Sequence, residues 1–107
     1  MVLPEFRIAV DADGARRTIV LGGELDLISA GELEATATRL CAEEIGELVI
    51  DLRGLTFVDS TGLRAILTCW DLAKGHCGFL LIPGPRAVQR LFEVTGLRDR
   101  LPFAAES

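Results

Sequence analysis

Several features that would place the chain in a membrane or outside the cell are missing from the sequence. No apolar run approaches the roughly 20 residues that a membrane-spanning helix requires. The segment Met1–Arg7 carries an acid and a proline where a signal peptide would have a basic flank and an apolar stretch. The three cysteines, Cys41, Cys69 and Cys77, are odd in number and far apart, unlike secreted disulfide frameworks. We therefore expect a cytoplasmic protein that does not insert into a membrane.

Positive charge is also scarce. The 107 residues include 11 basic and 16 acidic side chains, which gives a net charge of -5. Nucleic-acid backbones are bound by clustered Lys and Arg, so this balance argues against a nucleic-acid partner. With 50% of the residues hydrophobic and 25% charged, the composition is that of an ordinary folded protein. The length suits a single domain that spans residues 1–107.

The first part of the chain has the pattern of a β-hairpin. Apolar and other residues alternate from Phe6 to Val10, as in a half-buried strand, and residues 18–21 are again typical of a strand. Asp13-Gly14 is a turn signal between them, which predicts a hairpin whose loop is slightly longer than minimal. Gly22-Gly23 is expected to end the second strand.

Helices and strands then alternate. Ser29 and Glu32 have the spacing of a capping box, which predicts a helix from Ser29 toward Gly46. The pattern then predicts a buried strand over 48–52, a helix over 59–74, a strand over 79–82, and a helix from Pro85 to a C-terminal cap at Thr95-Gly96. The tail after Pro102 is expected to be loosely held. An opening hairpin followed by such alternation indicates the α/β class, with a mostly parallel mixed sheet packed against helices.

The segment between the third predicted strand and the second helix carries the residues of greatest chemical interest. Leu55, Phe57 and Val58 are expected to anchor it to the core, ahead of Asp59-Ser60-Thr61-Gly62. Asp59 is a favoured N-cap residue, and Ser60 would lie at the positive end of the helix dipole. Gly62 would leave room around Ser60. This pattern fits a simple helix cap, but it also fits a phosphoacceptor serine or an anion-binding turn.

Catalytic and metal sites find little support in the residues. A hydrolase nucleophile at Ser60 would lack the first glycine of the Gly-x-Ser-x-Gly motif. The sole histidine, His76, should lie about 20 Å away, beyond the far end of the same helix. Cys69, His76 and Cys77 lack the spacing of a structural zinc site. We therefore expect no enzyme, metal or cofactor, with Cys41, Cys69 and Trp70 in the core and the role of Cys77 open.

Longer motifs make the sequence resemble a known family. Gly23-Glu24-Leu25-Asp26 follows the second strand, and Val49-Ile50-Asp51-Leu52 leads to the segment from Leu55 to Leu63 that contains Asp59-Ser60-Thr61-Gly62. Residues 88–96 supply a third matching segment. In this order and spacing, they resemble the STAS domain, specifically the free-standing bacterial anti-sigma factor antagonists. The resemblance covers residues 8–101 and implies a STAS-type fold.

The resemblance also implies a function for the segment around Ser60. In this family, the serine at this position is phosphorylated by a partner that is both an anti-sigma factor and a serine kinase. The unphosphorylated antagonist binds this partner and releases the sigma factor, whereas phosphorylation ends the binding and a serine phosphatase restores it. Mapped onto this chain, the phosphorylation site is Ser60, and its neighbourhood and partner-binding surface include Asp26, Asp59, Thr61 and Gly62. We expect phosphorylation to act as a local electrostatic block with little change of fold.

The same domain has other uses within the family. STAS domains also serve as non-switching subunits of stress-sensing scaffolds and of membrane transporter complexes. Such a subunit would bind a protein without a cycle of phosphorylation at Ser60. A neighbouring gene for a kinase-type anti-sigma factor would favour the antagonist, and one for an ABC-type permease would favour the transporter role.

Overall fold

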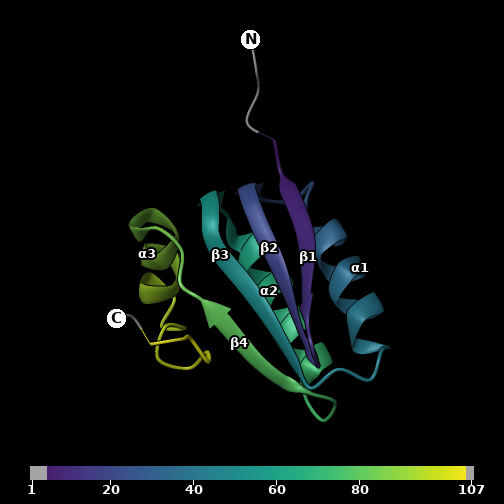
Figure 1. Cartoon of the computed structure of the whole chain (residues 1–107). Coiled ribbons are helices and arrows are strands. Elements are labelled where there is room, and N and C mark those ends of the chain that lie inside the picture. The colour runs from purple at the N-terminus through teal and green to yellow at the C-terminus, as the bar shows by residue number, and fades with distance from the viewer. Residues whose placement is uncertain (1–4, 106–107) are drawn as a thin grey trace.

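Residues 5–105 are described by a computed structural model, in which they form one four-stranded sheet and three helices (Figure 1). The elements, in chain order, are β1 (Arg7–Asp13), β2 (Arg16–Leu25), α1 (Ala30–Cys41), β3 (Glu47–Val58), α2 (Ser60–Ala73), β4 (Gly78–Ile82) and α3 (Arg86–Val94). The strands lie in the order β1-β2-β3-β4, which is also their order in the chain. β1 is antiparallel to β2, whereas β2, β3 and β4 are parallel to one another. The predicted α/β fold with a mostly parallel mixed sheet is confirmed.

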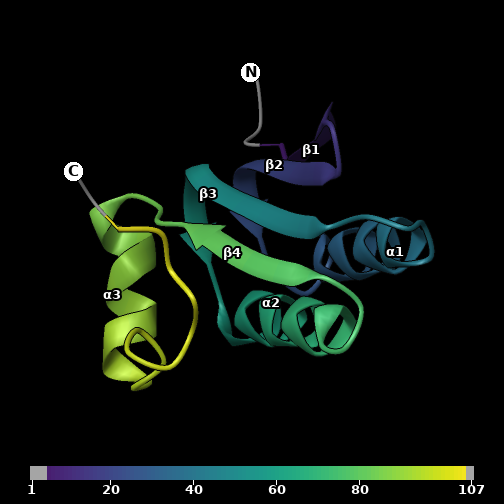
Figure 2. The same cartoon turned by 60° about the horizontal axis from the view of Figure 1, so that its bottom comes forward.

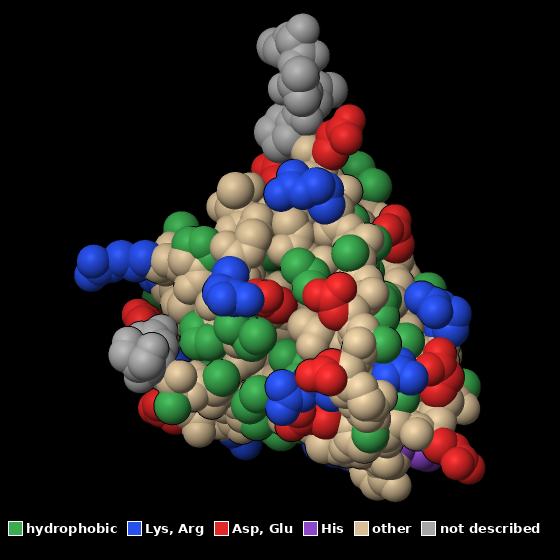
Figure 3. Space-filling model, viewed as in Figure 1, with side chains coloured by type: hydrophobic (Ala, Val, Ile, Leu, Met, Phe, Trp, Pro, Cys, Tyr) green, Lys and Arg blue, Asp and Glu red, His purple; other side chains and the backbone are tan. Residues whose placement is uncertain are grey.

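The helices are unevenly distributed over the sheet. α1 and α2 lie side by side against one face, and α3 stands apart from them beside the end of β4 (Figure 2). The predicted apolar stripe of α1, Leu33, Ala37 and Leu40, is buried in the core between this helix layer and the sheet. Within residues 5–105, no helix covers the other face of the sheet, and acidic and basic side chains are scattered over that side (Figure 3).

The hairpin is tighter and its second strand longer than the sequence suggested. Asp13 pairs with Arg16, so the loop contains two residues and the expectation of a longer loop was wrong. Gly14 has a φ of +59°, which suits the first position of such a tight loop. Gly22-Gly23 does not end β2, because the strand continues to Leu25 through two shifts in its register with β3. These glycines mark a bulge rather than a strand end.

β3 is also longer than predicted. The segment after Leu52, which was expected to be a loop, continues the strand to Val58 and pairs with the end of β2. Leu55 and Val58 are buried as predicted, but Phe57 is 46% exposed and does not anchor the segment to the core. The burial of residues 48–52 is confirmed.

The start of α3 differs from the prediction by one residue, whereas its end agrees with it. α3 begins at Arg86, with Pro85 as its N-cap rather than its first helical residue. The predicted cap at its other end is confirmed, because Gly96 has a φ of +74° and the Leu97 amide donates to the Phe92 carbonyl at 2.9 Å.

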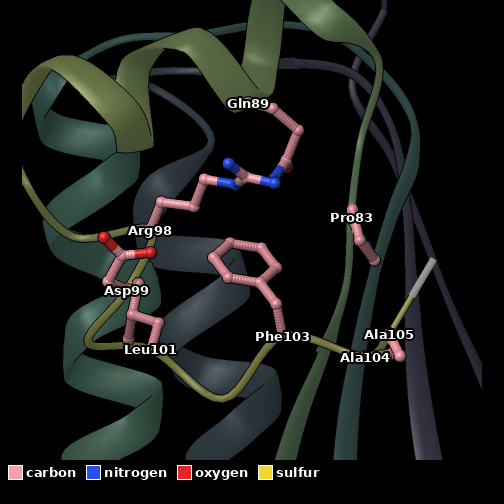
Figure 4. A pocket seen from close by; sticks show the side chains of 8 residues that line it. All are labelled: Pro83, Gln89, Arg98, Asp99, Leu101, Phe103, Ala104 and Ala105. Atoms are coloured by element: carbon pink, nitrogen blue, oxygen red, sulfur yellow. The ribbon is translucent and has the colours of Figure 1, made fainter.

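Residues 103–105 of the tail after Pro102 are held in place rather than loose. The Leu81 amide donates to the Pro102 carbonyl at 2.9 Å, and the Ala104 amide donates to the Leu81 carbonyl at 2.7 Å. The Phe103 and Phe92 rings meet edge to face, with centroids 5.0 Å apart. The tail thereby forms one wall of a cavity of about 340 Å³, across which the Arg98 side chain extends toward Gln89 (Figure 4).

Candidate surface around Ser60

The parallel ends of β2 and β3 bring two distant segments together. Leu25 pairs with Val58, and the Asp59 amide donates to the Leu25 carbonyl at 3.2 Å. Asp26 directly follows one strand, and Asp59-Ser60 directly follows the other. Both segments therefore lie at the upper edge of the sheet in Figure 1, where partner sites of parallel sheets are commonly found.

Asp59 caps α2 in the way the sequence predicted. Its backbone is extended, with φ -106° and ψ -175°, and its Oδ1 accepts a hydrogen bond from the Gly62 amide at 2.8 Å. Ser60 is the first residue of α2, and its side chain is exposed to solvent. The first amides of a helix have no partner within the helix, so a negative group on Ser60 would be stabilised by the helix end. Thr61, one position later, is half-buried.

Gly62 is required for a different reason from the one predicted. A Cβ at this position would lie 2.4 Å from the Leu25 carbonyl oxygen, far inside contact distance. The absence of a side chain therefore lets the start of α2 approach the end of β2. A side chain at position 62 would therefore meet the backbone of β2 rather than Ser60.

Asp26 organises the loop between β2 and α1. Its Oδ1 accepts hydrogen bonds from the amides of Ile28 and Ser29, at 3.0 and 3.2 Å. The buried Ser29 hydroxyl donates to the Glu24 carbonyl at 2.9 Å and accepts from the Asp26 amide at 2.9 Å. The predicted capping box with Glu32 is wrong, since Ser29 makes no side-chain cap bond to α1 and its hydroxyl binds the preceding loop instead.

This loop presents two apolar side chains that the sequence analysis missed. Leu27 is 74% exposed and Ile28 is 91% exposed, although both are large aliphatic residues. The signal was available, because they follow a strand end and precede a helix without fitting the periodicity of either. Neighbouring exposed apolar residues beside a cluster of polar ones are a common mark of a protein-binding surface.

A shallow groove adjoins the same edge on its other side. It has a volume of about 270 Å³ and lies between the end of β3 and α3, lined by Thr56, Phe57, Val58, Ala87, Arg90, Leu91 and Val94. Phe57 and Val94 are 46% and 70% exposed. The edge around Ser60 is therefore flanked by exposed apolar side chains, and we refer to Asp26–Ile28, Asp59–Thr61 and this groove as the Ser60 surface.

Other candidate sites lie elsewhere or are not formed. His76 follows the C-terminal end of α2, so it cannot act on Ser60 at the other end. Within residues 5–105, no three His, Cys, Asp or Glu side chains are placed to hold a metal ion. None of the helices in this part of the chain is long and apolar enough to cross a membrane. Cys69 is buried as predicted, whereas Cys41 and Trp70 are only half-buried at the edge of the core.

Comparison with protein families settles which family this architecture represents. The sequence profile described as "Mlab, STAS domain" matches residues 8–102, which is most of the chain. The chain belongs to the STAS domain family. The anti-sigma-B factor antagonist of Bacillus subtilis is 33% identical over 88 residues, which cover 81% of this chain and 80% of that protein. The predicted resemblance to the anti-sigma factor antagonists is thus confirmed, and with it the expectation of a regulatory protein rather than an enzyme.

Solved structures agree with the fold of this STAS domain. An anti-sigma factor antagonist from Mycobacterium paratuberculosis aligns with a TM-score of 0.86 at 24% identity, covering 95% of this chain and 87% of that one. The antagonist SpoIIAA in its unphosphorylated form gives a TM-score of 0.76 at 21% identity, covering 95% and 90%. The phosphorylated form of SpoIIAA, a Bacillus protein, gives a TM-score of 0.69 at 19% identity, covering 95% and 93%.

Proposed function

We propose that this STAS domain is an anti-sigma factor antagonist controlled by phosphorylation at Ser60. In its unphosphorylated form it binds an anti-sigma factor that is also a serine kinase, which frees the sigma factor. Phosphorylation of Ser60 ends this binding, and a serine phosphatase restores it. We further propose that the whole chain, residues 1–107, is a single domain that acts in the cytoplasm.

The observation that carries the proposal is the exposed Ser60 hydroxyl in the centre of the Ser60 surface. It stands on the first turn of α2, where a kinase can reach it and the fold can tolerate a phosphate. The exposed Leu27 and Ile28 and the groove at Phe57 supply apolar contacts on both sides for a protein partner. The names of the relatives, and the two forms of SpoIIAA, support the same assignment.

Electrostatics explains how one phosphoryl group would end the binding. A dianion about 6 Å from one carboxylate of a partner costs about 5 kcal/mol at an effective dielectric constant of 20, before screening. Half of this cost weakens an interface by about fifty-fold or more. The same phosphate gains about 0.3–1 kcal/mol from the α2 terminus, so we expect the domain itself to keep its fold.

The test measures phosphorylation and binding in one experiment. The partner is a kinase-type anti-sigma factor from the same genome. Wild type, Ser60→Ala and the control Thr61→Ala are incubated with this protein and ATP, then analysed by intact mass and by binding. We expect one added phosphoryl group on wild type and Thr61→Ala, together with a loss of binding of about fifty-fold or more. Ser60→Ala should gain no mass and should stay bound.

Two results would contradict the proposal. Phosphorylation of Ser60→Ala would place the acceptor elsewhere. An unmodified wild type that stays bound in the presence of ATP, with the kinase shown to be active on a known substrate, would favour a non-switching STAS subunit.

A further inference from the structure

Two of the three cysteines meet at the end of the molecule opposite Ser60. Cys41 is the last residue of α1, and Cys77 is the last residue of the connector between α2 and β4. The connector that follows α1 is joined to the first residue of β4 by a hydrogen bond from the Gly78 amide to the Gly46 carbonyl, at 2.9 Å. Both cysteines are half-buried and pack against the same core. Their position therefore results from the pairing of β3 with β4.

Cys41 lines the same cavity as His76, the residue directly before Cys77, so the two cysteines lie in the same part of the molecule. Burial, and then the nearby Cys77 thiol, raise the pKa of Cys41 above its ordinary value. Cys69 lies in the core, fully buried on α2, where burial raises the pKa of its thiol to about 12. The thiolate is the reactive form of cysteine, so Cys69 is inert at neutral pH. The raised pKa makes Cys41 a poor first nucleophile at neutral pH, so we place the first step on Cys77.

Solvent reaches this end of the domain. A cavity of about 620 Å³ opens at this end, and its lining includes Cys41 and His76, the residue directly before Cys77. An oxidant as small as hydrogen peroxide can therefore approach the half-buried thiols. Cysteines that are partly exposed and adjacent to a second thiol are those that undergo reversible oxidation.

We propose that Cys41 and Cys77 form a redox modification site that closes reversibly into an intramolecular disulfide under hydrogen peroxide. The Cys77 thiolate attacks one peroxide oxygen, the O–O bond breaks, and hydroxide leaves, so that Cys77 becomes a sulfenic acid. The Cys41 sulfur then attacks the Cys77 sulfur, the S–O bond breaks, and a second hydroxide leaves. The two thiol protons convert both hydroxides to water. The thiols lose two electrons and the peroxide gains them.

The disulfide would tie the end of α1 to the residue that precedes β4 and leave the Ser60 surface open. β3 and α2 lie within the loop that it closes. A cross-link around a loop of this length restricts the unfolded chain and raises stability, provided that the native geometry accepts it. Ser60 stands at the opposite end of α2, so oxidation should not block access to it.

Peptide mapping can test the pairing directly, because trypsin separates the three cysteines. Cleavage after Arg and Lys places Cys41 in peptide 40–53, Cys69 in 65–74 and Cys77 in 75–86. The reduced full-length protein is treated with equimolar hydrogen peroxide, blocked with N-ethylmaleimide, and analysed without reductant. We expect peptides 40–53 and 75–86 to be linked, and dithiothreitol to separate them. The thermal midpoint of the oxidised protein should rise by roughly 10 °C.

Variants distinguish this pair from other products. Cys69→Ala should still form the linked peptides, whereas Cys41→Ser and Cys77→Ser should form none. The proposal would be overturned by a link that includes peptide 65–74, by sulfinic or sulfonic acid at Cys77 in place of a link, or by dimers linked between chains. Complete recovery of three N-ethylmaleimide-blocked cysteines after peroxide treatment would also overturn it.

Discussion

At the scale of the residue, Asp51 shows how a buried charge is accommodated on the open face of the sheet. Its side chain is only 8% exposed, and Arg53, two residues later on β3, is 70% exposed. The Arg53 guanidinium donates to Asp51 Oδ2 from Nη2 at 2.9 Å and to Oδ1 from Nε at 3.1 Å. The backbone amide of Arg53 donates to the same Oδ1 at 3.0 Å. These bonds hold the pKa of Asp51 below its ordinary value, despite the opposing effect of burial.

This shift makes a contribution to stability that depends on pH. Because the folded pKa is lower than the unfolded one, the contribution is complete above the unfolded pKa of about 3.9 and is lost as pH falls through the folded pKa. We expect Asp51→Asn to lower the free energy of unfolding by about 1 kcal/mol at pH 7 and to have a smaller effect near pH 2. Urea denaturation across this pH range measures the difference.

The matched control for Asp51 is Asp71→Asn. Asp71 also pairs with a basic residue, Lys74, but its side chain is 72% exposed and the pair is on the surface. Such pairs contribute little, so we expect no measurable change at either pH. Equal effects of the two substitutions would show that the burial of Asp51 is not what matters.

At the scale of the element, the contact between the start of α2 and the end of β2 positions the Ser60 surface. We expect Gly62→Ala to lower the free energy of unfolding by about 1–3 kcal/mol, because the added Cβ would lie 2.4 Å from the Leu25 carbonyl oxygen. Gly31→Ala in α1 is the control, since its Cβ would meet nothing within 4 Å. We expect Gly31→Ala to be neutral or stabilising by up to about 1 kcal/mol. Chemical denaturation measures the free energy of unfolding of both variants. A loss of stability in Gly62→Ala alone indicates that the close contact with Leu25 is what requires glycine.

The elements also show which parts of the fold can be predicted from a sequence and which cannot. The apolar stripe of α1 and the buried run of β3 were predicted correctly, because the spacing of apolar residues along the sequence indicates which positions are buried. Gly22-Gly23 predicted a strand end, but β2 continues through it, and a Cβ on Gly23 would lie 2.0 Å from the Glu5 carbonyl oxygen. A glycine that ends a strand and one that kinks it look the same in a sequence, since only the partner strand tells them apart.

The Ser60 surface was predictable only in part for a similar reason. The Asp59 cap follows from local residue preferences, and the local sequence contains everything that it requires. Ser29 has the same local signal with Glu32, yet its hydroxyl binds the Glu24 carbonyl because the loop folds back on itself. The exposure of Leu27 and Ile28 depends on that loop, and its only sign in the sequence is that neither residue fits the periodicity of the flanking strand and helix.

At the scale of the whole molecule, the C-terminal tail completes the sheet. Both the amide and the carbonyl of Leu81 in β4 form hydrogen bonds with the tail, and Phe103 packs against Phe92 of α3. We expect Phe103→Ala to lower the free energy of unfolding by about 1–3 kcal/mol, less than for a fully buried ring because Phe103 is half-buried. Ala105→Gly, at an exposed position of the same tail, is the control. A Phe103→Ala variant as stable as the control would show that the tail adds nothing to the fold.

The strand order has a consequence for how the chain folds as it is synthesised. Each strand pairs with the one that precedes it in the chain, so every new strand finds its partner already synthesised. The hairpin pairs neighbouring residues and can form quickly, whereas each parallel pair must first close a crossover through a helix, which is slower. The sheet can therefore grow strand by strand as the chain leaves the ribosome, with the hairpin as its first unit. The tail follows β4 in the chain, and its pairing with that strand covers the edge that a growing sheet would otherwise leave open to other chains.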